Sequence, residues 1–294
     1  MRWKKVALVG VGLLGGSLGL ALKQRRLAES VVGFVRRPAS VKDCEKAGAV
    51  NQATLNLHEA VKGADLIVLC TPLAQMKALL KEILPVSKPN ALVTDVGSVK
   101  GSVVTDFERL LAGSTIQFVG SHPMAGGEKM GVGAARADLF VNAVCVVTPT
   151  RRSKQSAVRA VEELWKSVGG RVLELDPAAH DDLVSRSSHL PHLVAAAIAS
   201  AVLDSRRPAA QGLVCANGFR DVTRIASGSP EMWRDIGLAN SKHLGKALRS
   251  FIRDLQKLQG VIEKRDGVKL EKFFHNAKQL RDQWHSAGAS QATE

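Results

Sequence analysis

The sequence predicts a doubly wound α/β fold with a mostly parallel sheet, followed by an all-α domain. Short apolar runs alternate with helical segments from the amino terminus to about residue 176, as expected of strands joined by crossover helices. Beyond that point no convincing strand follows, and the remaining pattern is helical. We therefore expect two domains, residues 1–176 and 177–294.

The composition indicates a globular chain with a strongly basic surface. The 294 residues include 41 Lys and Arg against 27 Asp and Glu, a formal net charge of +14, and 45% are hydrophobic. The basic residues are scattered and aromatic residues make up only 4%, so an anionic small ligand fits better than a nucleic acid. The charge alone is equally compatible with an ordinary solvated surface.

Nothing in the sequence indicates export or membrane insertion. No apolar stretch is long enough to cross a membrane, and the amino terminus passes directly into a strand-like run. Cys44, Cys70, Cys145 and Cys215 are far apart, without metal-binding spacing. We expect a cytoplasmic protein with reduced thiols and no membrane partner.

The first apolar run leads into a glycine-rich turn and then a helix. Gly10, Gly12 and Gly15 form the pattern GxGxxG, which encloses Leu13 and Leu14. The first glycine allows a tight turn, the second lets the backbone approach a pyrophosphate, and the third lets helix and strand pack closely. The free N–H groups at the helix amino terminus attract phosphate. A strand before the motif and a helix after it favour a Rossmann-type dinucleotide site over a plain glycine-rich turn.

The end of the second predicted strand, residues 31–35, indicates which dinucleotide is bound. NAD-binding folds usually place an Asp or Glu there for the ribose 2′-hydroxyl. This sequence has Val35, followed by Arg36 and Arg37. No carboxylate would repel a 2′-phosphate, and two guanidinium groups could pair with one. We expect NADP as the cofactor, with NAD possible; the alternative is that both arginines are plain surface residues.

Later strands bring further residues to the same crevice. One ends at Thr71 and Pro72, and the next ends at Ser98, whose hydroxyl we expect to cap a helix beginning at Val99. Because the carboxyl ends of parallel strands face the ligand crevice, these three residues are expected to contact the cofactor. The other elements predicted in this domain are helices over residues 41–49, 75–84, 99–111 and 155–168 and strands over residues 143–148 and 171–175.

The segment SHPMAG, residues 121–126, carries the candidate catalytic base. His122 follows an apolar run, and Pro123 and Gly126 then turn the chain, so its imidazole is expected at the carboxyl end of a strand. A neutral imidazole beside a nicotinamide can take the proton of a hydroxyl while hydride leaves the same carbon. The alternative is an ordinary surface histidine.

Two clusters in the helical domain offer groups for an anionic substrate. His189 and His192 lie three residues apart on a predicted helix over residues 178–203. They are expected to line a pocket; a metal pair is the alternative, although no third ligand has suitable spacing. Arg220 and Arg224 are one helical turn apart, and a guanidinium can bind a carboxylate through two hydrogen bonds. Surface ion pairs are the alternative for both arginines.

The remaining helical segments predict a packed helical domain. The stretch over residues 193–203 is so poor in polar residues that we expect it to be buried on all sides, and a second subunit is one way to cover it. Further helices are predicted over residues 209–227, 230–239, 241–259 and 268–284.

These segments resemble the prephenate and arogenate dehydrogenases of tyrosine biosynthesis. The chain carries, in the family's order, GVGLLG, DVGSVK, SHPMAG, SSHLPH and GFRDVTRIA followed by MWRD. SHPMAG and GFRDVTRIA are specific to this family, whereas the glycine motif alone is not. The resemblance covers nearly the whole chain.

The resemblance implies NAD(P)-dependent oxidative decarboxylation of a cyclohexadienyl substrate, prephenate or arogenate. It implies that His122 is the base for the ring hydroxyl and that Ser98 hydrogen-bonds His122 and that hydroxyl. It also implies that Arg224 holds a substrate carboxylate. It also implies a homodimer formed through the helical domain. The other residues implied at the pocket and its entrance are His192, Arg220, Trp233 and Glu128.

Two other functions remain open at this point. A β-hydroxyacid dehydrogenase or imine reductase would share the dinucleotide half and the helical half, but would be expected to carry a catalytic lysine on a helix. A non-enzymatic dinucleotide-sensing basic protein needs only the glycine motif and the charge, and it leaves His122 without a role.

Overall fold

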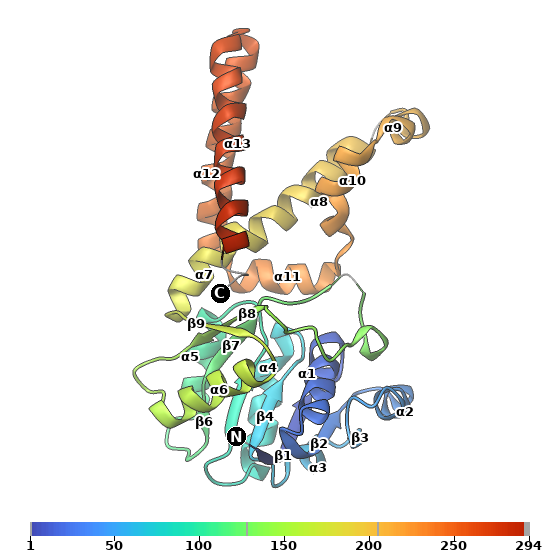
Figure 1. The fold of residues 1–294 in the computed structure, drawn as a ribbon, viewed down its shortest axis with the longest axis vertical. Coiled ribbons are helices and arrows are strands. Elements are labelled where there is room, and N and C mark those ends of the chain that lie inside the picture. Colours follow the sequence, from blue (N-terminus) through green and yellow to red (C-terminus); the bar gives the residue numbers. More distant parts are fainter. Residues whose placement is uncertain (1, 128, 205, 291–294) are drawn as a thin grey trace. The chain divides into compact units, whose positions relative to one another are not determined.

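The chain forms two compact units, residues 1–244 and 245–294 (Figure 1). The computed structural model describes residues 2–127, 129–204 and 206–290. Both sheets belong to the first unit. Within the described ranges, no helix is both long and apolar enough to span a membrane.

The main sheet has six parallel strands in the order β3-β2-β1-β4-β5-β6. This is the order of doubly wound dinucleotide-binding sheets, and its direction reverses between β1 and β4, where a ligand crevice forms. The predicted fold class, a parallel α/β domain followed by a helical domain, is confirmed. The strands are β1 (Trp3–Val9), β2 (Ala28–Phe34), β3 (Gln52–Thr54), β4 (Leu66–Leu69), β5 (Leu92–Asp95) and β6 (Gln117–Phe118).

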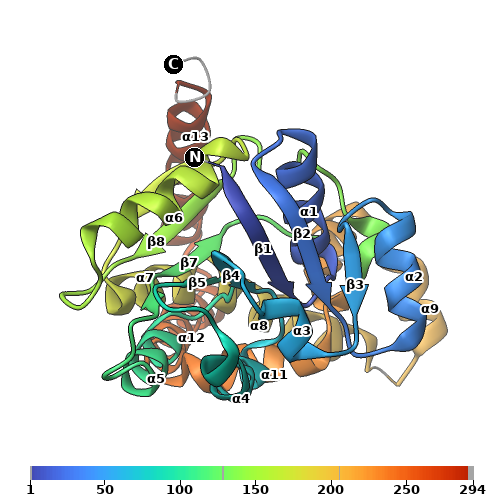
Figure 2. The same ribbon diagram turned by 90° about the horizontal axis from the view of Figure 1, so that it is seen from below.

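Helices cover both faces of this sheet (Figure 2). Successive strand side chains point to opposite faces, so Val6 and Leu8 of β1 enter one core while Ala7 and Val9 enter the other. The first core is closed by α1 (Leu13–Gln24), α2 (Pro38–Lys46) and α6 (Gln155–Ser167), and the second by α3 (Leu57–Val61), α4 (Leu73–Ile83) and α5 (Gly101–Leu110).

A second, three-stranded sheet departs from the single sheet expected. β7 (Gly120–Pro123) pairs antiparallel with β8 (Val144–Thr148), which pairs parallel with β9 (Arg171–Glu174). The chain leaves the main sheet at Val119, because the Ser121 N–H donates to the Asp95 carboxylate (3.2 Å) instead of to a strand backbone. His122 therefore lies opposite Val146 in the second sheet.

The expected helix over residues 178–203 is continuous but contains a π turn. α7 (Pro177–Val184) passes through the π turn Ser185–His189 into α8 (Leu190–Leu203). Pro191 has no N–H, and in a regular helix its ring would clash with the carbonyl of residue 187. The wider turn relieves this conflict, and such turns are frequent at functional sites.

Only Ala195 of α8 is buried in the single chain, so the expectation of burial on all sides is wrong for the isolated chain. The helix that was expected over residues 209–227 is divided into three pieces. The remaining helical elements of the first unit are α9 (Pro208–Val214), α10 (Asn217–Thr223), the 3-10 turn Arg224–Ser227 and α11 (Pro230–Ala239).

The second unit is a helical hairpin. It comprises most of α12 (Ser241–Glu263) and all of α13 (Gly267–Ser290), joined by a short turn in which Arg265 has a φ of +53°. Large apolar side chains remain exposed on it, among them Ile252, Phe274 and Trp284.

Candidate active site

The glycine turn leads from β1 into α1, and its backbone is tightly packed except at Gly12. Gly10 has a φ of +98°, and its N–H donates to the Phe34 carbonyl at the end of β2 (3.0 Å). A Cβ at Gly15 would lie 2.1 Å from the Gly10 carbonyl oxygen, so helix and turn pack as closely as backbones can. A Cβ at Gly12 would meet no atom within 4 Å. The turn therefore leaves room for a phosphate at Gly12, beside the start of α1 at Leu13 and Leu14.

Residues beside this turn fit a dinucleotide. Thr71 and Pro72 follow β4, and among the described residues the buried Thr71 hydroxyl has no hydrogen-bond partner, as expected of a group that bonds a ligand. Arg36 and Arg37 are exposed immediately after the buried Val35. An open backbone, an unpaired hydroxyl and two guanidinium groups suit the phosphate groups of a dinucleotide.

His122 is held by a chain of hydrogen bonds that defines its protonation. Its Nδ1 lies 2.9 Å from Nε2 of His180, and Nδ1 of His180 lies 2.8 Å from Oδ1 of Asp181. A carboxylate can only accept, so the His180 proton is on Nδ1 and its Nε2 accepts. His122 must then carry its proton on Nδ1, which leaves the lone pair of its Nε2 available. This is the orientation that a general base requires.

The carboxylate at the end of this chain is fixed by the start of a helix. Asp181 of α7 accepts the backbone N–H groups of Lys100 and Gly101, each at 2.8 Å. Burial alone would raise the pKa of Asp181, but the hydrogen bonds from His180 and from both amides hold that pKa below its usual value. Asp181 therefore stays ionised and anchors the imidazole chain.

The surroundings of His122 keep it neutral. The side chain is 8% exposed. Burial lowers its pKa well below the usual 6.5, and the neighbouring basic groups His180, Lys100 and His189 lower it further by opposing a second positive charge. A neutral imidazole can accept a proton at physiological pH, so this environment suits a base.

A buried ion pair lies behind the base. Lys100 and Asp95 are both fully buried and hydrogen-bonded to each other, and Lys100 Nζ also donates to the Ser121 carbonyl (2.7 Å). Burial lowers the pKa of Lys100, an effect that Asp95 opposes. The pair joins the ends of β5 and β7 and so fixes the backbone that carries His122.

Ser98 has a different local role from the one expected. The prediction that it caps a helix starting at Val99 is wrong, because α5 begins at Gly101 and its first amides bind Asp181. The carboxylate takes both N–H groups that an N-cap hydroxyl would have bonded. Ser98 instead occupies an irregular, half-buried turn after β5, and its hydroxyl makes no described bond to His122.

The two histidines of the helical domain lie against Trp233. His192 stacks on its ring with a centroid distance of 3.8 Å, and His189 meets the same ring edge-on at 6.2 Å. His192 Nδ1 lies 2.9 Å from the Ser188 carbonyl, whereas His189 is only 1% exposed. In the described part of the chain, no group of three His, Cys, Asp or Glu side chains is arranged to hold a metal.

The arginine cluster lies at the surface. Arg220 is on α10 and Arg224 begins the following 3-10 turn, next to α8, and both are exposed. Asp235, an acidic residue of the neighbouring α11, forms an ion pair with Arg234 at 2.7 Å. Glu128, expected at the pocket entrance, lies outside the described residues.

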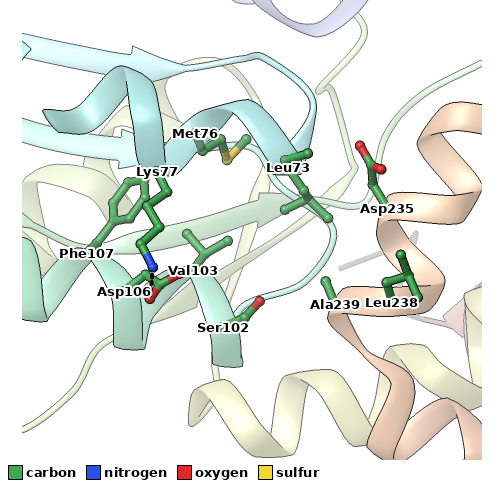
Figure 3. A pocket seen from close by; sticks show the side chains of 11 residues that line it. Leu73, Met76, Lys77, Ser102, Val103, Asp106, Phe107, Asp235, Leu238 and Ala239 are labelled. Atoms are coloured by element: carbon green, nitrogen blue, oxygen red, sulfur yellow. Dashed lines mark hydrogen bonds and ion pairs between the residues drawn. The ribbon is translucent and has the colours of Figure 1, made fainter. Parts of the chain in front are cut away.

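A separate cavity of about 360 Å³ lies between α4, α5 and α11 (Figure 3). Its walls include Leu73, Phe107 and Leu238, and the ion pair between Lys77 and Asp106 (2.8 Å) lies along one side. None of the predicted site residues that the structure describes lines this cavity.

Several site residues were not found from the sequence. His180, Asp181 and Lys100 were not singled out, although HD at the start of a helix and the buried lysine in DVGSVK are chemically conspicuous. Their roles depend on contacts between segments 58 to 81 residues apart in the sequence. A doubly wound sheet with an open glycine turn, followed by a strand that carries a buried, oriented imidazole, is typical of a nicotinamide-dependent dehydrogenase.

Comparison with known proteins is consistent with this class. The sequence model "Prephenate dehydrogenase, nucleotide-binding domain" matches residues 18–174, and "Prephenate dehydrogenase, dimerization domain" matches residues 176–276. A prephenate dehydrogenase of Bacillus subtilis is 36% identical over 94% of this chain and 75% of its own.

Solved structures of the same kind superpose closely. Prephenate dehydrogenase from Aquifex aeolicus, in complex with hydroxyphenyl propionate and NAD+, has a TM-score of 0.89 and 31% identity, over 96% of this chain and 98% of that one. Arogenate dehydrogenase from Synechocystis has a TM-score of 0.79 and 30% identity, over 95% and 99% of the two chains.

The chain belongs to the prephenate/arogenate dehydrogenase family, oxidoreductases that carry out nicotinamide-dependent oxidative decarboxylation of a cyclohexadienyl substrate. The expected resemblance, fold class and enzyme class are thereby confirmed. Membership decides against both the β-hydroxyacid dehydrogenase alternative and the non-enzymatic one.

Proposed function

We propose that this chain oxidises prephenate, arogenate or both at the ring C4 hydroxyl, with His122 as the general base. The observation that carries the proposal is the chain from Asp181 through His180 to His122, which leaves the lone pair of His122 Nε2 available. The same family includes proteins described as acting on each of the two substrates.

The chemistry at His122 is the transfer of the C4 hydroxyl proton, coupled to the loss of a hydride from C4. The bound nicotinamide supplies the acceptor for the C4 hydride. His122 Nε2 takes the hydroxyl proton as the C4 carbonyl forms. That carbonyl then draws the electron pair of the C1–carboxylate bond, CO2 leaves, and the ring becomes aromatic. The phenolate oxygen can take its proton back from His122, so no net proton is consumed.

The remaining proposed site residues hold the substrate and cofactor. Arg224 binds a substrate carboxylate, and Ser98 contacts the cofactor and the reacting hydroxyl. A planar guanidinium can grip a carboxylate with two hydrogen bonds, which supports the role of Arg224. The proposed pocket is lined by Arg220, His189, His192 and Trp233, and Glu128, which lies outside the described residues, is proposed as an ionic partner at its entrance.

We propose NADP as the preferred cofactor, bound by Gly10, Gly12, Leu13, Leu14, Gly15, Thr71 and Pro72, although the Aquifex relative was solved with NAD+. The support is local: Val35 replaces the usual acidic residue, and the exposed Arg36 and Arg37 follow it at the end of β2. Replacing both arginines by alanine should raise KM for NADP at least tenfold and leave KM for NAD nearly unchanged. Equal effects on both cofactors would contradict the 2′-phosphate role.

The family model names residues 176–276 a dimerization domain, and we propose a homodimer. On α8, Leu193, Ala196, Ala197 and Ser200 are exposed and recur at helical spacing. Leu193 offers apolar surface, and the small side chains of the other three allow close helix packing. Ala197→Glu should therefore shift sedimentation from dimer to monomer, while Ala112→Glu, an exposed site beyond α5, should not. A dimer unaffected by Ala197→Glu would place the interface elsewhere.

We also propose that the domains divide between residues 176 and 177, in line with the limits of the two family matches, and that the protein is cytoplasmic.

The decisive experiment on function compares initial rates for prephenate and arogenate, each with NAD and NADP. The expected result is reduced-nicotinamide absorbance growing with at least one substrate, faster with NADP. No reduction in any of the four mixtures would refute the proposed function.

A further inference from the structure

Asn240 lies at the junction of α11 and α12 and is 2% exposed. Its Nδ2 donates to the backbone carbonyl of Asp181 (2.9 Å) and lies 3.2 Å from Nδ1 of His189. A carbonyl oxygen can only accept a hydrogen bond, so the amide nitrogen and not the amide oxygen must face Asp181. The orientation of the Asn240 amide is therefore fixed by its partner.

This orientation decides where His189 carries its proton. The amide nitrogen has two hydrogens, one for Asp181 and one directed at Nδ1 of His189, so Nδ1 accepts and the ring proton lies on Nε2. That Nε2 is buried and makes no hydrogen bond of normal length within the described residues. The backbone carbonyl of Ser98 is the acceptor that acts on this ring, where it raises the pKa of His189 against the larger effect of burial. His189 thus presents a donor to the turn that carries Ser98.

His122 and His189 consequently have opposite tautomers, and Asp181 determines both of them. Its carboxylate, through His180, places the proton of His122 on Nδ1. Its backbone carbonyl, through Asn240, places the proton of His189 on Nε2. One imidazole is left as an acceptor for the substrate, and the other is left as a donor toward Ser98.

We propose that Asn240 is a positioning residue, which holds His189 in the Nε2–H tautomer so that His189 anchors the Ser98 turn during turnover. This inference rests on the proposed function in one respect, that Ser98 contacts cofactor and substrate. Neither Asn240 nor His189 needs to touch the reacting atoms.

The variant Asn240→Asp reverses the polarity at nearly constant shape. A carboxylate cannot donate to His189, so a neutral imidazole would move its proton to Nδ1 and lose the Nε2 donor. We expect kcat to fall about tenfold at alkaline pH, as expected for the loss of one buried supporting hydrogen bond. Protonation of His189 at lower pH places an N–H on both of its ring nitrogens and so restores the Nε2 donor. The ratio of wild-type to variant kcat should therefore shrink as pH falls.

The groups that face His189 and influence this titration are His180 and Asp181 of α7, His192 of α8 and His122 of β7. Asn90→Asp, an exposed site with the same change of charge, serves as the matched control and should match wild-type kcat throughout. A ratio for Asn240→Asp that is constant with pH would indicate a merely structural role and overturn the proposal.

Two further measurements keep the test independent of how well one variant folds. His189→Gln retains an N–H near the Nε2 position and should keep most of kcat, whereas His189→Leu should lose about tenfold. Imidazole 15N spectra of the wild-type chain, assigned with His189→Gln, should show His189 as the Nε2–H tautomer. A neutral Nδ1–H form of His189 would refute the inference even if the enzyme is active. Absence of dehydrogenase activity would instead refute the proposed function and leave the tautomer measurement standing.

Discussion

Replacing His180 by leucine tests the orientation of the base without touching it. In the wild-type chain, Nε2 of His180 accepts the Nδ1–H of His122 at 2.9 Å, and both rings are buried. In His180→Leu that proton has no partner inside the protein. His122 can escape the cost by moving its proton to Nε2, which blocks the lone pair required for catalysis.

The size of the effect follows from that cost. Leaving a buried donor unsatisfied costs about 1–3 kcal/mol, and each 1.4 kcal/mol changes a population about tenfold. The productive tautomer of His122 should therefore fall roughly ten- to a hundredfold in population, and kcat with it. Cofactor affinity should stay within about twofold of wild type, because His180 lies behind the base and not in the glycine turn.

The assay is steady-state kcat together with the dissociation constant of the cofactor, measured on His180→Leu and on His180→Gln. The glutamine amide oxygen can accept the proton of His122, so we expect His180→Gln to retain more activity than His180→Leu. An unchanged kcat in His180→Leu would refute the orientation argument. Equal losses of kcat in both variants, accompanied by equal losses of thermal stability, would show that His180 contributes only to packing.

Three further predictions follow from other parts of the molecule. Gly15→Ala should lower the melting temperature measured by calorimetry, because the new Cβ would lie 2.1 Å from the Gly10 carbonyl oxygen. Gly12→Ala should keep the fold but weaken cofactor binding measured by titration. Arg224→Ala should mainly raise KM for the dicarboxylic substrate, and a loss confined to kcat would contradict carboxylate binding. Burial lowers the pKa of His189 from 6.5 to about 4, so the unfolded chain takes up that proton first and stability is lost as pH falls below 6.5. The contribution of His189 to the free energy of unfolding by urea should drop by about 2 kcal/mol between pH 7 and pH 5, and the buried His122 adds to this loss; a pH-independent free energy would contradict buried neutral imidazoles.

The nucleotide half of the fold could be predicted because its signals are local. Residues 6–9 are continuously apolar, as a strand buried on both faces should be, and the glycine spacing follows at once. The edge strand β3 (Gln52–Thr54) was not predicted, since it is short and its exposed side chains leave no apolar run. The break between β6 and β7 was also not predicted, because it depends on the side chain of Asp95, which is distant in sequence.

The candidate site was predictable only where a residue carries its own chemistry. His122 was identified by its type and its position at a strand end. Its supporting partner Asp181 was not, because the contact between that carboxylate and the start of α5 joins segments far apart in the chain. For the same reason the sequence assigned the cap of this helix to Ser98, the nearest hydroxyl.

The most direct test of the central claim is single-turnover hydride transfer by His122→Asn with cofactor and substrate both saturating. Asparagine cannot accept a proton near neutral pH, so the rate should fall by about a hundredfold or more while the cofactor dissociation constant stays near that of wild type. A hydride-transfer rate equal to that of wild type would show that the proton leaves by another route and would contradict the role of His122 as base.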